Sequence, residues 1–184
     1  MLREPGARER ILSAGLEEVA EHGAAGARTA RIAARAGVNK QLIHYYFLTK
    51  AGLYQAVLDR AASSVAAELA ALPLVGLTAV ERLRRLIRGQ FEFFLTHPQH
   101  ALVLTTAKGD GNWANLAIRP VAALLSAGQA TGFFRDDIDP EAHARLALLV
   151  TLSYFALNSV TSDWGPASDW RDRSADLIVR GCTW

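Results

Sequence analysis

The chain has 184 residues, 51% of them hydrophobic, which is enough to bury one sizeable core or a small module fused to a larger one. Its formal net charge of only +2 excludes a wholly basic coat protein for nucleic acid. The single cysteine, Cys182, excludes an internal disulfide framework and suits a reducing compartment. The first residues lack the apolar stretch of a secretory signal, and the most apolar run, residues 146–160, is shorter than the roughly 20 residues that span a bilayer. We therefore expect a cytoplasmic protein without a membrane segment.

The N-terminal third is predicted to form four helices. The first spans about residues 7–22, where apolar residues recur at helical spacing, and Gly23 ends it. Gly37 supplies the backbone freedom that a tight turn between the second and third helices needs. The fourth helix reaches about Leu72. Short polar side chains are expected to cap the last three helices by accepting free backbone N–H groups: Thr29, Asn39 and Thr49.

The remaining two thirds are predicted to add five helices, which makes the chain all-α with about nine helices and no strand. Pro120 is expected to kink or break a long apolar helix over about residues 112–131. Asp139, followed by proline and glutamate, predicts a strong helix start. The last helix is expected to open at Ser168.

Residues 29–47 are typical of two short helices joined by an Ala-Gly-Val turn. Such a pair can lay one helix in the major groove of DNA while the other crosses the phosphate backbone. Lys40 and Gln41 begin the second helix, where lysine can donate to guanine and glutamine can pair with adenine. The other expected DNA-binding residues grip phosphate or hold the helix in position: Thr29, Arg31, Asn39, His44, Tyr45 and Lys50.

Each of these residues also has an ordinary structural interpretation. Arginine, lysine and glutamine on short helices most often form a solvated face, and a Tyr-Tyr-Phe run is most often core. Leu42 either contacts a thymine methyl group or packs inward. The basic excess favours DNA binding, because residues 1–60 hold nine Lys and Arg against six Asp and Glu, whereas residues 61–184 hold eleven against twelve.

The spaced set carries a family resemblance. Its parts are Ile11-Leu12-x-Ala14, Gly23, Thr29-x-x-Ile32-Ala33-x-x-Ala36-Gly37-Val38, and Tyr45-Tyr46-Phe47-x-x-Lys50-x-x-Leu53. Over roughly residues 8–60 the chain thereby resembles the TetR (tetracycline-repressor-like) family of bacterial transcription regulators. The resemblance implies a helix-turn-helix DNA-binding domain over residues 1–50 and a helical ligand-binding and dimerisation domain over residues 51–184. Two departures are His44, where the family usually has tyrosine, and Gln41-Leu42, where it usually has small or polar residues.

Dimerisation and ligand sensing are the expected tasks of the larger part. Helix-turn-helix dimers read paired half-sites, so a two-fold partner on a palindromic operator is expected. The last two helices, about residues 140–161 and 168–182, are predicted to form the interface, the alternative being core helices of a monomer. A small, largely apolar effector would release a repressor from DNA by shifting its conformational equilibrium. The candidate ligand contacts, which are otherwise plain core or interface, are Phe91, Phe94, Trp113, Tyr154 and Asn158.

No catalytic constellation is found, so we expect no enzyme and no cofactor. His97 and His100 are three residues apart and offer two metal ligands, with Asp110 the nearest acid downstream. Two ligands without a third are weak evidence, and solvated histidines are the ordinary interpretation. The sequence therefore predicts no metal site.

Overall fold

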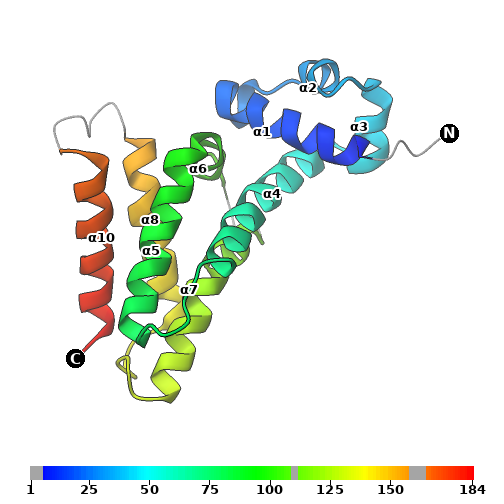
Figure 1. Cartoon of the computed structure of the whole chain (residues 1–184). Helices are drawn as coiled ribbons and strands as arrows, with labels where there is room; N and C mark the ends of the chain where they lie inside the picture. Colours follow the sequence, from blue (N-terminus) through cyan, green and yellow to red (C-terminus); the bar gives the residue numbers. More distant parts are fainter. Residues whose placement is uncertain (1–5, 109–111, 158–164) are drawn as a thin grey trace.

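The computed structural model describes residues 6–108, 112–157 and 165–184. Within these ranges the chain forms nine α-helices and no strand, which confirms the all-α prediction. The helices are α1 (Ala7–Gly26), α2 (Thr29–Ala36), α3 (Lys40–Phe47), α4 (Lys50–Ala70), α5 (Ala79–Thr96), α6 (Pro98–Thr105), α7 (Trp113–Ala130), α8 (Pro140–Ala156) and α10 (Ala167–Cys182). In Figure 1, α1, α2 and α3 form a small cluster at one end of a larger helical body, and the long helix α4 joins the two.

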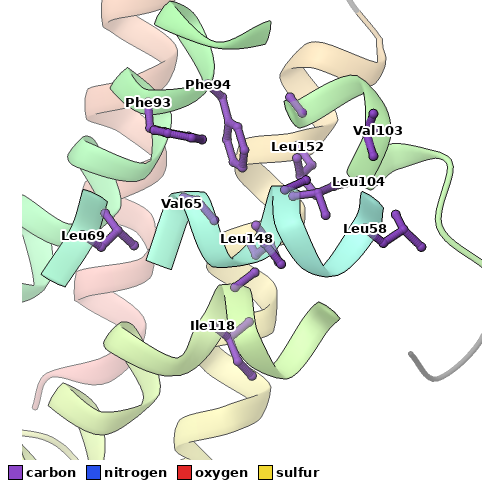
Figure 2. Packing of buried hydrophobic residues seen from close by; sticks show 14 of the residues in the cluster. Leu58, Val65, Leu69, Phe93, Phe94, Val103, Leu104, Ile118, Leu148 and Leu152 are labelled. Carbon is purple, nitrogen blue, oxygen red and sulfur yellow. The ribbon is translucent and has the colours of Figure 1, made fainter. Parts of the chain in front are cut away.

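Helix α4 belongs to the cores of both parts. Near its start it packs on α1, where Gly15 leaves room for Val57; a Cβ atom at Gly15 would lie 2.7 Å from Val57 Cγ2. Further along it packs between the helices of the body. Figure 2 shows how its leucines and valine meet side chains from α5, α6, α7 and α8: Leu58, Val65, Leu69, Phe93, Phe94, Val103, Leu104, Ile118, Leu148 and Leu152. Helix α4 is therefore a continuous packed connection between the body and the N-terminal cluster.

The predicted caps are confirmed at Asn39, Thr49 and Asp139, whose side-chain oxygens each accept a backbone N–H from the first turn of the following helix. The prediction for Thr29 is wrong. The residue before α2 is Arg28, which makes no side-chain cap, and Thr29 is the first helical residue. The N–H group of Arg28 instead donates to the carboxylate of Glu18 at 2.9 Å, so a residue of α1 supplies the missing acceptor.

The two expected helix interruptions have different outcomes. Gly23 does break the helical geometry of α1, with a φ of 68° and a ψ of 170°. Pro120 does not break α7, which continues from Trp113 to Ala130. The ring removes one N–H donor, but packing against α4 and α8 holds the turns on both sides of it in place.

None of the helices in the described ranges is both long and apolar enough to cross a lipid bilayer.

Candidate nucleic-acid interface

Helices α2 and α3 are held in a fixed relation by the turn between them. Gly37 has a φ of 63°, in the left-handed region that glycine adopts without steric cost, and its N–H bonds back to α2. Asn39 Oδ1 then accepts the N–H of Gln41 at 2.9 Å and starts α3. Ile43 and Phe47 are buried, so α3 is anchored by one face and leaves the other in solvent.

The exposed face of α3 carries the residues predicted to meet DNA. Lys40, Gln41, His44 and Tyr45 are all exposed, and 62% of the Tyr45 surface is accessible. No acidic side chain in the described part of the chain forms an ion pair with Lys40 or His44. The basic charge of this face is therefore free for a partner.

Three helices meet at a shallow hollow of about 190 Å³, which we call the α2–α4 hollow. It joins the start of α2 to the outer face of α3 and the start of α4. Its walls carry two ammonium groups, an imidazole and two hydroxyls, a set that suits a phosphate group of a nucleic-acid backbone. The lining residues are Thr29, Lys40, Ile43, His44, Leu48, Thr49 and Lys50. The structure thus brings together four residues predicted from sequence as DNA contacts, namely Thr29, Lys40, His44 and Lys50.

Arg31 lies apart from this hollow. Its guanidinium donates from Nε to Glu18 Oε1 at 2.6 Å and from a terminal nitrogen to the carbonyl oxygen of Gly26 at 2.9 Å. These bonds fasten α2 to α1. Arg31 was predicted as a phosphate contact, but its observed bonds are those of an anchor inside the module.

Glu18 is the residue of this module that sequence reasoning missed. Its side chain has no accessible surface, and Oε1 accepts bonds from both Arg28 N–H and Arg31. Burial by itself raises the pKa of the Glu18 carboxyl, but the bonds from Arg31 and Arg28 outweigh it and lower the pKa below its ordinary value. The available signal was a charged residue between Leu16 and Val19, on the buried side of α1.

In the larger part, the structure brings three of the five predicted ligand contacts together. Phe91 and Phe94 are fully buried, and the ring centroids of Phe91 and Tyr154 lie 5.1 Å apart. Phe155 joins them, 5.5 Å from Phe91 and 5.9 Å from Phe94. We call these four residues of α5 and α8 the aromatic cluster. Trp113 lies at the start of α7, and Asn158 is outside the described residues.

Several buried polar groups in this part lack a hydrogen-bond partner among the described residues, among them Nε2 of Gln90, Nδ1 of His100 and Nε1 of Trp113. Gln90 is 1% exposed and comes directly before Phe91 of the aromatic cluster. An unsatisfied buried N–H costs free energy that a water molecule or a ligand acceptor can recover. Gln90 was not predicted, although a glutamine in register with Leu83, Ile87 and Phe94 on an apolar helix face was a visible signal.

An open groove of about 520 Å³ lies between α4 and α7. Its walls are mostly alanine and leucine, and it is within the size range of small-molecule sites. Arg119 is exposed at this groove and forms no ion pair within the described ranges. The groove residues are Ala66, Ala67, Leu69, Ala70, Leu74, Leu86, Arg119, Pro120, Ala123 and Leu124.

Helices α8 and α10 expose large apolar side chains. Leu146, Leu149 and Leu157 recur at helical spacing along α8 and its end, and 49%, 58% and 44% of their respective surfaces are accessible. Leu177 of α10 is 63% exposed, and Trp184, just beyond the end of α10, is 85% exposed. Exposed apolar residues gathered in this way are typical of an interface.

The histidine pair does not acquire a third metal ligand in the described ranges, and Asp110 lies outside them. Burial lowers the pKa of His100 to about 4, so its ring is neutral at physiological pH. Glu18, Glu21 and His22 do lie within ligand distance of one another. Both carboxylates are already bound by arginines, Glu18 by Arg31 and Glu21 by Arg35, so this group is an ion-pair network.

Comparison with known proteins agrees with this geometry. The sequence profile described as "Bacterial regulatory proteins, tetR family" matches residues 11–57. The HTH-type transcriptional repressor NicS of Pseudomonas putida is 30% identical over 95% of this chain and 91% of its own length. The HTH-type transcriptional repressor SCO4008 of Streptomyces coelicolor is 49% identical over 32% of this chain and 31% of its own length.

Among solved structures, the transcriptional regulator FadR from Bacillus subtilis, in complex with stearoyl-CoA, superposes with a TM-score of 0.76 at 16% identity. That match covers 94% of this chain and 98% of the other, so it concerns the whole fold. The helix-turn-helix geometry, the family profile and the similarity to NicS along nearly the whole length agree. The chain belongs to the tetR family of bacterial regulatory proteins.

Proposed function

We propose that this regulator is a repressor that binds a palindromic operator as a homodimer and is released by a small, largely apolar effector. The α2–α4 hollow carries the proposal, because it gathers phosphate-binding groups from three helices beside the exposed face of α3. NicS and SCO4008 are named as transcriptional repressors, which supports repression as the mode of action. Because bacterial operator DNA lies in the cytoplasm, we propose that the protein acts there. The proposed function requires no catalysis, metal or cofactor.

Two classes of DNA contact are proposed. Lys40, Gln41 and Tyr45 stand on the exposed face of α3 and reach base edges or the adjoining backbone. Thr29, His44 and Lys50 surround a phosphate in the α2–α4 hollow. Asn39 positions α3 through its cap, and Arg31 positions α2 through Glu18.

Alanine at Lys40 and at Lys50 is expected to weaken operator binding in different ways. Lys40→Ala removes a base contact, so its cost of about 1–3 kcal/mol should vary among operator sequences. Lys50→Ala removes a phosphate contact, so it should weaken binding equally on all sequences and flatten the salt slope by about one unit for each copy bound. Salt-titrated gel shifts on operators selected from random DNA measure both. Equal sequence dependence and equal salt slopes in the two variants would contradict the assigned roles.

The exposed leucines of α8 and α10 support a homodimer built from these two helices. A two-fold axis beside them would bury the same residues of both copies against one another and place two α3 helices on one side of the assembly. Leu149 lies within this surface and is 58% exposed in the monomer, so it is a suitable position at which to test the interface.

Leu149→Glu is expected to convert the dimer to a folded monomer, because it would place two carboxylates in an apolar interface. Sedimentation equilibrium measures the change, and circular dichroism shows whether the helices persist. Leu102→Glu is the matched control, since Leu102 is 40% exposed on α6 rather than on α8 or α10. A dimer that persists in Leu149→Glu would move the interface elsewhere.

The effector is proposed to bind at the aromatic cluster and to accept a hydrogen bond from Gln90. The buried, unpartnered amide of Gln90 supports this location. An effector that binds the DNA-free conformation more tightly by about 5 kcal/mol would switch the population almost completely. Helix α4 packs in the body and follows α3 directly in the chain. A displacement of α4 would therefore change the distance between the two α3 helices of the dimer.

Gln90→Leu is expected to leave operator binding intact and to abolish release by the effector. Removal of the unpaired amide should also keep or raise the free energy of unfolding, by up to about 1 kcal/mol. Small molecules recovered from the purified protein would be identified by mass spectrometry and then added to gel shifts, which measure release. Ala67→Trp, which fills the groove between α4 and α7, is the control; loss of release in this variant alone would place the effector in that groove instead.

A further inference from the structure

Leu48, between α3 and α4, has a backbone conformation that leucine rarely adopts. Its φ is 62° and its ψ is −49°, and every other positive φ in the described ranges belongs to a glycine. The N–H of Thr49 bonds to the carbonyl oxygen of Phe47 at 2.6 Å, which closes a three-residue turn around Leu48. A turn of this form with a positive central φ is rare and strained.

The side chain of Leu48 recovers little of this cost inside the chain. It is 69% exposed, although leucine is among the residues most often buried. Glycine would adopt the same backbone angles without a Cβ penalty. A leucine that is both strained and exposed points to an interaction outside the folded chain.

The surroundings of Leu48 indicate the kind of partner. Leu48 lines the α2–α4 hollow together with Thr29, His44 and Lys50, the residues proposed above to hold a phosphate. In DNA, each backbone phosphate is flanked by two deoxyriboses, whose carbon faces are apolar. An apolar side chain at the rim of a phosphate-binding hollow therefore matches the sugar next to the bound phosphate.

We infer that Leu48 is a further DNA-contact residue, whose side chain packs against a deoxyribose beside the phosphate held in the α2–α4 hollow. The inference rests on the DNA interface proposed above. The contact is apolar and faces the backbone, so it strengthens binding to operator and to unrelated DNA by the same factor. The strained turn presents the side chain to the duplex. It lowers the free energy of unfolding and raises the affinity for DNA.

Two variants separate the side chain from the strain. Leu48→Ala keeps a Cβ at the positive φ but loses the apolar contact, whereas Leu48→Gly loses the contact and relieves the strain. Both are expected to weaken DNA binding by about tenfold, on selected operator and on random duplex alike, with an unchanged salt slope. Only Leu48→Gly is expected to raise the melting temperature, by about 2–4 °C. Val75→Ala, at a 98% exposed position in the 72–77 segment, should change neither quantity.

Three outcomes would overturn the inference. Unchanged DNA affinity in both Leu48 variants, while Lys50→Ala still weakens binding, would remove Leu48 from the interface and leave the interface standing. A fall in the melting temperature of both variants would assign Leu48 a structural role. Leu48 would be a base contact if its variants lost affinity only for operators that contain thymine, and if wild type lost the same affinity when uracil replaced that thymine. If Lys50→Ala has no effect either, the proposed interface itself fails.

Discussion

Replacement of Arg31 by alanine is expected to lower the free energy of unfolding by about 3 kcal/mol, which is a large loss for one side chain near the surface. The reason lies in Glu18, whose carboxylate has no accessible surface and receives its charged partner from Arg31 at 2.6 Å. Without Arg31 the carboxylate must stay buried with one N–H donor, take up a proton, or open the contact between α1 and α2. Urea unfolding at neutral pH measures the loss.

Two further variants test this explanation. Arg35→Ala is the matched control, because Arg35 also joins α2 to α1 but pairs with the exposed residues Glu17 and Glu21. Its cost is expected to be much smaller than that of Arg31→Ala, because solvent screens an exposed ion pair. The double variant Glu18→Leu with Arg31→Leu removes both charges and should recover part of the lost stability, although it leaves the N–H of Arg28 without its acceptor. If Arg31→Ala costs no more than Arg35→Ala, the buried carboxylate is not what makes Arg31 important.

The effect of acid follows from the sign of the pKa shift. The pKa of Glu18 is lowered in the fold, so its ion pair stabilises the protein above the ordinary pKa of 4.5 and loses this contribution as pH falls through the lowered value. The difference in unfolding free energy between wild type and Arg31→Ala should therefore be full at neutral pH and shrink in acid.

The double variant also separates the two roles considered for Arg31. A residue that only anchors α2 can be replaced together with Glu18 without changing the salt dependence of operator binding. A residue that contacts phosphate would flatten the salt slope by about one unit for each copy, however stable the protein remains. Gel shifts on the double variant decide between the anchor seen in the structure and the contact expected from the sequence.

The local features of the module were predictable from the sequence. The Gly37 turn and the caps at Asn39 and Thr49 depend on residues within a few positions of one another, and the structure confirms them. The start of α2 was not predictable in this way, because its acceptor comes from Glu18, ten residues earlier on another helix. The hydroxyl of Thr29 is a plausible cap from the local sequence, which does not show that α1 supplies the acceptor.

The same limit applies to the larger part. Helical spacing on α5 singled out Phe91 and Phe94, but it could not show that Tyr154 and Phe155 of α8 lie against them. Gln90 is a candidate ligand contact only because its amide is buried without a partner, since the amide of an exposed glutamine would be hydrogen-bonded to water. The groove between α4 and α7 depends on the packing of two helices about fifty residues apart, and no local pattern encodes it. The positive φ of Leu48 likewise has no local sequence signal, because leucine is not a residue that favours this conformation.

Gly52→Ala is expected to be the most damaging addition of a single methyl group to the N-terminal module. A Cβ atom at Gly52 would lie 2.3 Å from the carbonyl oxygen of Phe47, a backbone atom at the end of α3. Either α3 or the first turn of α4 must shift, so the cost should approach about 3 kcal/mol. Because this junction fixes the angle of α3, operator affinity should fall with stability. Urea unfolding and gel shifts on the same preparation measure both.

Gly89→Ala is the control variant for Gly52→Ala. A Cβ atom there would also meet a close neighbour, at 2.6 Å, but that neighbour is the end of the Leu72 side chain, which can rotate away. Its cost should stay below about 1 kcal/mol, since alanine also favours the helical backbone of α5. Equal costs for the two variants would mean that the α3–α4 junction yields as easily as a side chain. The orientation of α3 would then be fixed by the burial of Ile43 and Phe47 and not by the α3–α4 junction.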